Sequence, residues 1–363
     1  MKQICLIGGK LQGFEVAYHA RKAGIRVVLV DRNKDALIKD LVDIFYCFDV
    51  MEEPERLIGI SGTVDAMIPV NENFDTIDLL ETIKDKLQCP LLFDFDAYRV
   101  SRDKSTSKKY FRSIGIPTPM DKPTHPPYFI KPYCMSSSIG AAIIYDDEDL
   151  KGLDPTMLIE EYVEGDVLSI EVVGDGEHFT VVKEAKVHID DTYDCHMVTP
   201  VGHNPELRMV AYKLARGLKL KGIMDVEAID SPQGLKVLEI DARFPSQTPT
   251  VVYHSSGINL LELLLQAFTE GVQETFQVPE NNYCIYEHFL LKDGILLPIG
   301  EQILSMGNNY RMLHASEGIE IFQCDGEYNA FTVITWDKDQ KKAEMNRKKA
   351  HEMILGITEQ EVI

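Results

Sequence analysis

The sequence lacks the features of a secreted or membrane-spanning protein. Its seven cysteines are an odd number, lie far apart and include no C-x-x-C pair, so neither a disulfide framework nor a redox pair is expected. No apolar stretch approaches the length of a membrane span, and the opening MKQICLIGG reads as a strand followed by glycines rather than a secretion signal. We therefore expect a cytoplasmic protein that crosses no membrane.

Basic residues are also scarce, since 37 Lys and Arg stand against 58 Asp and Glu and give a formal net charge of -21. The electrostatic field of this negative charge repels nucleic-acid phosphates and anionic membrane surfaces, so neither is an expected partner. A bound nucleotide would need lysines of its own and a divalent cation to offset the field. Small molecules are the expected partners, and the sequence leaves a homodimer open.

What is present is the composition of a globular protein, with 45% hydrophobic and 26% charged residues. A chain of 363 residues exceeds one ordinary core, so we expect three domains, over 1–84, 85–165 and 166–363. The first of these alternates strand and helix patterns, KQICLIGG, FEVAYHARKAG and RVVLVD, which predicts a βαβ unit in a parallel, Rossmann-like sheet. Further strand patterns follow at 128–133, 140–145, 157–163 and 167–173, and helical patterns at 101–115, 208–220, 258–271 and near the C-terminus.

A glycine-rich loop follows the first strand and invites a dinucleotide-binding interpretation. Gly8, Gly9 and Gly13 precede Asp31 by about twenty residues, but the spacing G-G-x-x-x-G differs from G-x-G-x-x-G and Lys10 lies near the expected crossing point. A nicotinamide-dependent dehydrogenase that uses this loop therefore stays open as an alternative. We favour a loop that serves another ligand.

The most informative segment is GIMDVEAIDSPQGLKVLEIDAR, residues 222–243, which reads as two strands joined by a turn at 231–234. Side chains alternate along a strand, so a register that pairs Glu227 with Glu239 also places Asp225 opposite Asp241. Facing like charges destabilise a sheet, more so if apolar neighbours such as Met224, Val226, Leu238 and Ile240 cover the other face. Oxygen ligands without His or Cys favour magnesium, whereas a solvated acidic hairpin is the plainer alternative.

Two lysines lie in positions that suit an anion. Lys104 begins a basic segment, and Lys131 stands inside the apolar strand YFIKPY, where an unpaired ammonium is costly to bury. A loop of small residues, Ser136 to Ser138 and Gly140, follows and could present its N–H groups to phosphates, while the run from Glu160 to Val163 ends a later strand. Each feature by itself is also typical of an ordinary exposed strand end.

The order of these features resembles the ATP-grasp family, from Lys104 to about Gly257, with the Rossmann-like domain in its usual preceding place. The fold implied is α/β, in part α+β, with a Rossmann-like N-terminal domain, an ATP-grasp fold and a C-terminal mixed extension. The cofactors implied are ATP and magnesium, which we expect as two ions. The resemblance assigns ATP to Lys104, Lys131, Ser138, Glu160, Glu161, Tyr162 and Val163, and the metal to Glu227, Glu239 and Asp241. The family commonly has asparagine where Asp241 stands in E-x-D-x-R, so metal affinity or a substrate amine has to account for the added charge.

Within that family, ICLIGGKLQGFE, SRDKSTSKKYF and DARFPSQTPTVVYHSSGINL look like ligases that join (3R)-3-methyl-D-ornithine to the side-chain amine of lysine in pyrrolysine biosynthesis. The resemblance implies phosphorylation of the donor carboxylate to an acyl phosphate and displacement of phosphate by the amine, with Arg243 as the catalytic residue. The donor contacts expected are Asp166, Asp225, Arg243, Ser246 and Thr248. The lysine contacts expected are Lys10, Leu11, Gln12, Glu72, Ser246 and Ser255.

Other functions stay open at this point. A D-alanine ligase-like enzyme or a carboxylating purine enzyme would share the fold, and a nucleotide-binding module would share the site without turnover. The group His188, Cys195 and His196 suggests zinc, but its spacing fits no common site and a polar loop is the better interpretation. The basic C-terminal helix is best explained as a solvated face that needs no anionic partner.

Overall fold

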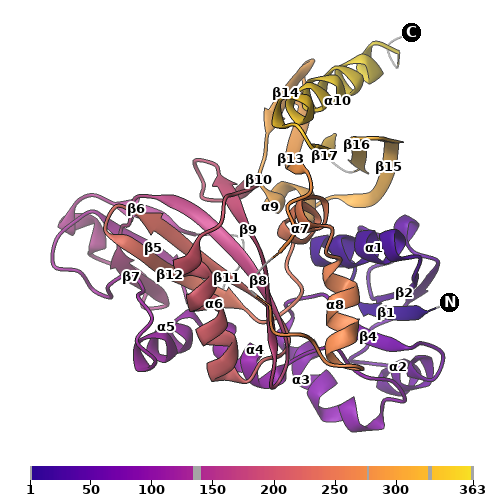
Figure 1. The fold of residues 1–363 in the computed structure, drawn as a ribbon, viewed down its shortest axis with the longest axis horizontal. Coiled ribbons are helices and arrows are strands. Elements are labelled where there is room, and N and C mark those ends of the chain that lie inside the picture. Colours follow the sequence, from indigo (N-terminus) through magenta and orange to yellow (C-terminus); the bar gives the residue numbers. More distant parts are fainter. Residues whose placement is uncertain (1, 134–139, 276–277, 326–328, 361–363) are drawn as a thin grey trace.

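The computed structural model describes residues 2–133, 140–275, 278–325 and 329–360. It combines helices with both parallel and antiparallel sheets, as the predicted α/β class with α+β character requires. The serine loop predicted to contact phosphates, Ser136 to Ser138, lies outside the described residues. Figure 1 shows the N-terminal domain beside a long twisted sheet, a small sheet at the opposite end, and a C-terminal extension above them.

The N-terminal domain is a parallel sheet in the order β3-β2-β1-β4, which confirms the predicted βαβ unit. Helix α1 ends at Gly24, whose φ of 67° is a left-handed conformation that glycine adopts without strain. Asp31 accepts a 2.7 Å hydrogen bond from the Gly9 N–H and so closes the glycine loop of its own domain. The elements are β1 Gln3–Ile7, α1 Leu11–Ala23, β2 Arg26–Asp31, β3 Ile44–Cys47, α2 Pro54–Ser61, β4 Ala66–Pro69 and α3 Phe74–Ile83.

Two helices stand where the sequence predicts one beginning near Ser101. Helix α4, Phe95–Ser101, ends at that residue, and α5, Lys104–Ser113, begins three residues later. The reason is a second N-cap, because Asp103 accepts the Thr106 N–H at 2.6 Å. A three-stranded antiparallel sheet in the order β6-β5-β7 follows, built from β5 Tyr128–Pro132, β6 Ala142–Ile144 and β7 Met157–Glu161.

The remaining strands form one ten-stranded antiparallel sheet, in the order β12-β11-β8-β9-β10-β13-β17-β16-β15, with β14 paired to β13. The sequence did not predict β9, β10 or helix α7, and the C-terminal strands extend this same sheet. The elements are β8 Asp166–Asp175, β9 Phe179–Ile189, β10 Cys195–Pro200, α6 Pro205–Leu218, β11 Lys221–Ser231, β12 Gly234–Asp241, α7 Thr248–Ser256, α8 Leu260–Ala267, β13 Tyr283–Lys292, β14 Ile295–Pro298, α9 Glu301–Ser305, β15 Asn308–Ser316, β16 Ile319–Asp325, β17 Ala330–Asp337 and α10 Gln340–Gln360.

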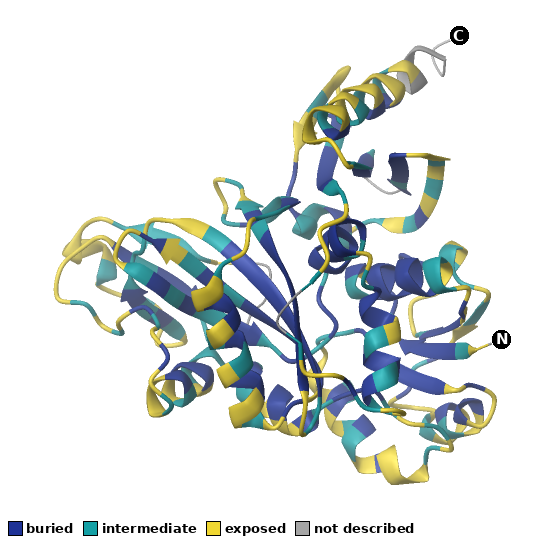
Figure 2. Cartoon of the chain, viewed as in Figure 1, coloured by how far each residue is buried: buried dark blue, intermediate teal, exposed yellow. Residues whose placement is uncertain are grey.

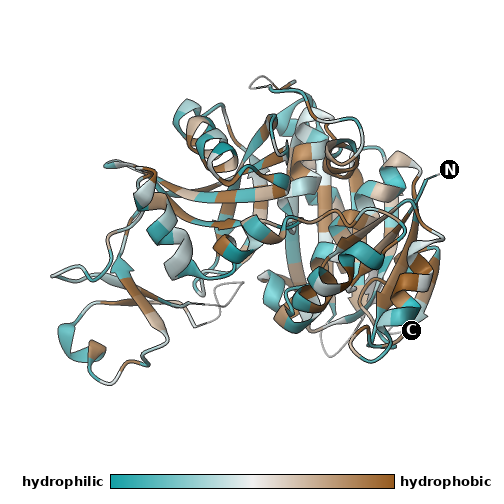
Figure 3. Ribbon diagram, turned by 90° about the horizontal axis from the view of Figure 1, so that it is seen from below, coloured by the Kyte–Doolittle hydropathy of each residue, from teal (hydrophilic) through white to brown (hydrophobic). Residues whose placement is uncertain are grey.

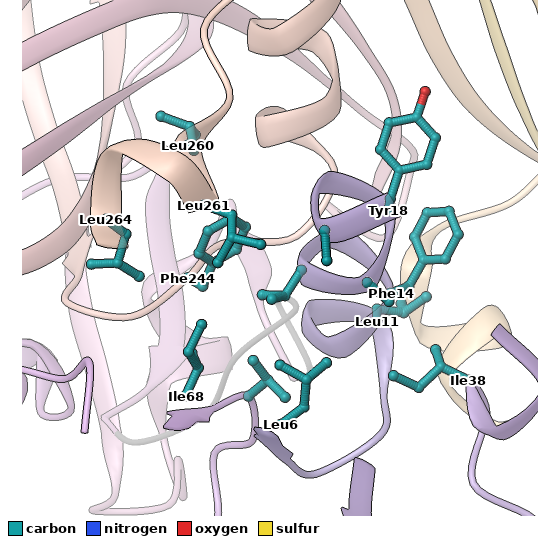
Figure 4. Close-up of a cluster of buried hydrophobic side chains, with 14 of the residues drawn as sticks. Leu6, Leu11, Phe14, Tyr18, Ile38, Ile68, Phe244, Leu260, Leu261 and Leu264 are labelled. Atoms are coloured by element: carbon teal, nitrogen blue, oxygen red, sulfur yellow. The ribbon is translucent and has the colours of Figure 1, made fainter. Parts of the chain in front are cut away.

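A buried apolar cluster joins the N-terminal domain to the large sheet. Leu11 and Phe14 on α1 belong to the same cluster as Phe244 and the leucines of α8, Leu260 and Leu261, and part of this cluster is drawn in Figure 4. The ring of His19 on α1 lies 5.9 Å from that of Phe244. Because interiors pack as densely as crystals, this contact fixes α1 relative to the segment that follows β12. The N-terminal domain is therefore part of the frame around that segment.

Burial is greatest along the central strands, whereas the outward face of α10 is exposed, as Figure 2 shows. The exposed face agrees with the predicted solvated basic helix. The small sheet projects from the body in the view of Figure 3. Among the described helices, none is both long and apolar enough to cross a bilayer.

Candidate active site

A cavity of about 280 Å³ lies between the small sheet and the β11–β12 hairpin. It gathers side chains from the small sheet, α5, β11, β12, the segment after β12 and α9, which are far apart in the sequence. Many of the predicted site residues line it, namely Lys104, Lys131, Glu160, Glu161, Tyr162, Val163, Asp225, Glu227, Glu239, Asp241, Arg243, Ser246 and Thr248.

The β11–β12 hairpin has the register that the sequence predicts. Glu227 pairs with Glu239 and Asp225 with Asp241. One expectation is wrong: Leu238 lines the cavity instead of covering the other face. The cause is a β-bulge, because Ala228 pairs with Val237 and so leaves Leu238 as an extra residue on its strand.

The facing carboxylates of this hairpin differ strongly in their proton affinity. Burial raises the pKa of Glu227 well above its ordinary value, and the charge of Glu239 raises it further. Burial also acts to raise the pKa of Glu239, but the ammonium groups of Lys104 and Lys131 outweigh it and lower that pKa. The Nζ atom of Lys104 lies 2.9 Å from Glu239 Oε2. A cation beside Glu227 would offset the repulsion from Glu239 and so favour the charged form of Glu227.

The donor set fits magnesium held together with a nucleotide. Among the described residues, no three His, Cys, Asp or Glu side chains already converge on one metal position. Magnesium commonly takes only one or two protein carboxylates, and substrate phosphates and water supply its other oxygens. The facing pair of Glu227 and Glu239, with Asp241 two residues further along β12, offers a partial set of oxygen ligands of this kind.

The lysines around the cavity belong to a buried charge cluster that the sequence reveals only in part. Lys131 Nζ lies 3.0 Å from Glu160 Oε1, and the other oxygen of Glu160 pairs with Lys108. Lys108 is 1% exposed and also lies 2.8 Å from Asp121. Sequence analysis did not single out Lys108, although it stands four residues after Lys104 and so shares its helix face. The Glu160 side chain thus holds two ammonium groups in place.

A second acidic niche lies beside the hairpin, on β8. Asp225 accepts a 2.6 Å hydrogen bond from the Ser169 hydroxyl, and Glu171 pairs with Asp225 across β8 and β11. Burial raises the pKa of Glu171 to about 7 and that of Asp225 well above its ordinary value. Ser169 and Glu171 alternate with apolar residues along VLSIEVV, which is a pattern that could have revealed them.

Two of the residues predicted for lysine, Gln12 and Glu72, reach the site through Arg243. Glu72 Oε1 accepts from Gln12 at 2.7 Å and lies 2.7 Å from Arg243 Nη2, which also lies 3.0 Å from Asp241. Neither Gln12 nor Glu72 lines the cavity itself. Through these contacts a single side chain, Arg243, links Glu72 of the N-terminal domain to Asp241 on β12.

Four further predicted contacts lie away from the cavity lining. Lys10 is exposed before α1, while Leu11 is buried in the apolar cluster. Ser255 is fully buried and donates to the Val252 carbonyl at 3.4 Å. Asp166 is exposed and lies 2.7 Å from Lys186. Their assignments to substrates stay predictions.

The structure adds residues from distant parts of the chain that sequence analysis missed. Asp194 and Glu301 line the cavity, and the Ser246 hydroxyl donates to Glu301 at 2.8 Å. Helix α9, which carries Glu301, has only five residues, so no periodic pattern could reveal it. Cys195 also lines the cavity, and burial raises its pKa well above the ordinary value.

The group that suggested zinc does not lie in a loop. His188 is on β9 and Cys195 and His196 are on β10, so the predicted polar loop is wrong. The His188 and His196 rings lie 6.4 Å apart, and His188 shares a 2.9 Å hydrogen bond with Thr199. Two strands missed by sequence analysis account for the error.

Helix α7 begins in the site and receives its N-terminal cap from another domain. Glu15 on α1 accepts hydrogen bonds from the Thr250 N–H at 3.2 Å and the Thr250 hydroxyl at 2.7 Å. Gln247, the residue before α7, has a φ of 67° and provides no side-chain cap. Glu15 therefore satisfies a helix end that a local side chain would ordinarily satisfy, and it holds the residues before α7 in place.

We expect Glu15 to make the free energy of unfolding fall between pH 4.5 and 7. Burial raises the pKa of Glu15 from 4.5 to about 7, against the hydrogen bonds from Thr250, Tyr286 and Gln247 that lower it. The unfolded chain loses this proton near pH 4.5 and the folded chain near 7, so stability is fully present below the first value and declines up to the second. The decline is on the order of 3 kcal/mol, from about 1.36 kcal/mol per pKa unit. Urea unfolding at pH 5 to 8 measures it.

In that series, Glu15→Gln should unfold with a flatter dependence on pH than the wild-type protein. The exposed Glu52→Gln, in the same domain, is the matched control. An unaltered slope in Glu15→Gln would show that Glu15 keeps its charge throughout and caps α7 as a carboxylate.

Comparison with known proteins gives a consistent result. Residues 101–247 match the model of an ATP-grasp domain. The chain is 63% identical to the 3-methyl-D-ornithine–L-lysine ligase of Methanosarcina barkeri, with 96% of each chain covered, and 61% identical to that of Methanosarcina acetivorans, with 98% of each covered. Its fold is similar to the biotin carboxylase domain dimer of Hydrogenobacter thermophilus 2-oxoglutarate carboxylase, solved with MgADP, ADP and bicarbonate. That match has a TM-score of 0.73 at 16% identity and covers 96% of this chain and 89% of the other. The predicted ATP-grasp fold is confirmed.

Proposed function

Because the chain belongs to the 3-methyl-D-ornithine–L-lysine ligases, we propose that its ATP-grasp cavity activates one amino acid and couples it to another. The enzyme is an ATP-dependent carboxylate–amine ligase, which joins 3-methyl-D-ornithine to L-lysine in pyrrolysine biosynthesis. The observation that carries the assignment of the site is the facing pair Glu227 and Glu239 beside Lys104 and Lys131, in a cavity that Asp225 of the acidic niche also lines.

The phosphate end of the cavity is the end that the lysines surround. We assign Lys104 and Lys131 to the phosphates of ATP, and Tyr162 and Val163 to the nucleotide base. Glu227, Glu239 and Asp241 would hold magnesium as two ions, which when bound neutralise charge on the transferred phosphoryl group. Lys104 now pairs with Glu239, so it would exchange that partner for a phosphate when the nucleotide enters.

The donor end lies along β8 and β11. Ser169, Glu171 and Asp225 together offer oxygen atoms to an ammonium group, which an ornithine-type donor carries twice. Arg243 lies between Asp241 and Glu72, so its guanidinium is placed to orient the donor carboxylate as it attacks the γ-phosphate. The same guanidinium would stabilise the oxyanion when the amine later attacks the acyl phosphate.

The acceptor end is assigned to the N-terminal domain, with Gln12, Glu72 and Ser246 as lysine contacts and the small sheet as a lid. We propose the units 1–84, 85–165 and 166–363 as the corresponding domains. A homodimer is also proposed, and its support is the dimer formed by the similar biotin carboxylase domain.

The direct test is the reaction itself. Purified protein with ATP, magnesium and 3-methyl-D-ornithine should release ADP much faster when L-lysine is added. The product should have the summed mass of both amino acids less one water, and tandem mass spectrometry should place the amide on the lysine side chain. Lysine-independent ADP release without this product would contradict the assignment.

We expect Glu72→Gln to raise the KM for lysine by about 10-fold or more. A charged hydrogen bond is worth about 1.5–3 kcal/mol, and glutamine keeps the shape while it removes the charge. The KM for the donor should change less. Steady-state kinetics with each substrate varied separately measures both constants, and the exposed Glu55→Gln is the control. An unchanged KM for lysine would contradict the acceptor assignment.

A further inference from the structure

Two carboxylates outside the metal-facing hairpin line the same cavity. Glu301 is the first residue of α9 in the C-terminal extension, and Asp194 precedes β10. Neither residue is among those proposed to bind the metal or the nucleotide. Neither has a role in holding phosphate, where a negative charge would repel the nucleotide.

Glu301 is held in position by the segment that contacts the donor. Its Oε2 atom accepts from the Ser246 hydroxyl at 2.8 Å, and the Gln247 side-chain Nε2 lies 3.5 Å away. Gln247 in turn lies 3.0 Å from His288 Nε2 on β13. The charge of Glu301 is also among those that raise the pKa of Arg243, after Asp241 and Glu72.

Asp194 contacts the first turn of the short helix that carries Glu301. It is 3% exposed, and its Oδ2 atom accepts the Gln302 N–H at 2.9 Å. Gly300 permits this approach, because a Cβ there would collide with the Asp194 carboxylate. Within the described part of the chain, its second oxygen, Oδ1, is buried with no hydrogen-bond partner. A buried carboxylate oxygen in that state is satisfied by a cationic or hydrogen-bond donor ligand.

We propose that Glu301 receives the amino group of the acceptor and takes its proton, with Asp194 as a second carboxylate that holds the ammonium. This inference rests on the proposed function. Ser246 is shared between the donor and acceptor assignments, so its partner Glu301 lies where the two substrates meet. An amine with a reference pKa of about 10.4 is almost wholly protonated at neutral pH and cannot attack until it loses a proton.

The step balances without a further reagent. The acceptor ammonium gives one proton to the Glu301 carboxylate, and the nitrogen lone pair then forms the C–N bond to the acyl carbon. The C–O bond to the phosphate breaks, and phosphate leaves with that electron pair. It also takes the second proton from nitrogen, so the products are the amide, hydrogen phosphate and protonated Glu301, which returns its proton to water.

The test uses two nucleophiles with the full-length enzyme. Lysine must be deprotonated before it attacks, whereas hydroxylamine is largely unprotonated at neutral pH and converts an acyl phosphate to a hydroxamate without a base. For Glu301→Gln we expect kcat/KM for lysine to fall by about 10²- to 10⁴-fold, the usual contribution of general base catalysis. Donor-dependent hydroxamate formation should stay within about twofold of the wild-type rate.

Glu317→Gln, an exposed carboxylate of the same extension, is the control and should behave as wild type with both nucleophiles. Asp194→Asn should raise the KM for lysine more than it lowers kcat. An equal loss with lysine and hydroxylamine in Glu301→Gln would overturn the inference, because Glu301 would then support activation of the donor or the fold. So would undiminished ligation of lysine. A wild-type enzyme that forms the hydroxamate but no amide with lysine would instead overturn the proposed acceptor, and the inference with it.

Discussion

Glu227→Gln should leave the enzyme inactive and, without ligands, more stable than the wild-type protein. Glu227 faces Glu239 across the hairpin, and burial together with that charge raises its pKa well above the ordinary value. Ionisation of Glu227 is therefore less favourable in the folded chain than in the unfolded chain, and this difference lowers stability at pH values above the ordinary pKa of a glutamate. Glutamine removes this cost and keeps the shape, so we expect the free energy of unfolding to rise, by on the order of 1 kcal/mol.

The activity of Glu227→Gln should fall by at least about 100-fold, because mutation of groups that only support metal ligands already costs 10- to 100-fold. Glu239→Gln is the matched comparison. Its carboxylate is stabilised by Lys104 and Lys131, so its loss leaves two ammonium groups with one partner fewer and should destabilise the protein. Calorimetry without nucleotide and magnesium measures both shifts in Tm.

Tm shifts of opposite sign in these two variants would show that repulsion between the carboxylates destabilises the free site and that bound ligands remove this repulsion. Such a cost is expected where stability is traded for function. Destabilisation of both would show that Glu227 is already satisfied in the free protein. Magnesium with ADP should also raise the wild-type Tm more than that of either variant, because ligands stabilise only the state that binds them.

The hairpin was predictable because its information is local. Alternation along two strands and a four-residue turn decide which carboxylates face one another, and no distant contact is needed to establish the register. The bulge that turns Leu238 into the cavity interrupts that alternation, and the amino-acid sequence of the strand does not indicate it. The split between α4 and α5 was in principle readable, since Asp103 is a favoured N-cap residue directly before Lys104.

The residues that sequence analysis missed are those whose role depends on tertiary contacts. Glu301 stands 55 positions after Ser246, to which it bonds. Glu15 caps a helix 235 positions away. Such pairs leave no periodic trace, so only the fold reveals them. Ser169 and Glu171 are intermediate, because their alternation was visible but their partner Asp225 lies on another strand.

Lys108→Met should cause the largest loss of stability among the single substitutions considered. Lys108 and Glu160 are each 1% exposed, and Lys108 also lies 2.8 Å from Asp121. Methionine fills a similar volume but leaves the Glu160 carboxylate buried with Lys131 as its remaining ammonium partner in the cluster. Removal of one partner from a buried ion pair costs about 3–5 kcal/mol, whereas an exposed pair contributes about 1 kcal/mol or less.

The neighbouring Lys109→Met provides the control, since Lys109 is exposed on the same helix and should change the free energy of unfolding by less than about 0.5 kcal/mol. Urea unfolding of both variants gives the difference. Because Glu160 also positions Lys131, Lys108→Met should weaken ATP binding even under conditions where the variant is fully folded. A loss below 1 kcal/mol would mean that Lys131 alone satisfies Glu160. Lys108 would then serve the nucleotide rather than the fold, and its substitution should weaken ATP binding without lowering stability.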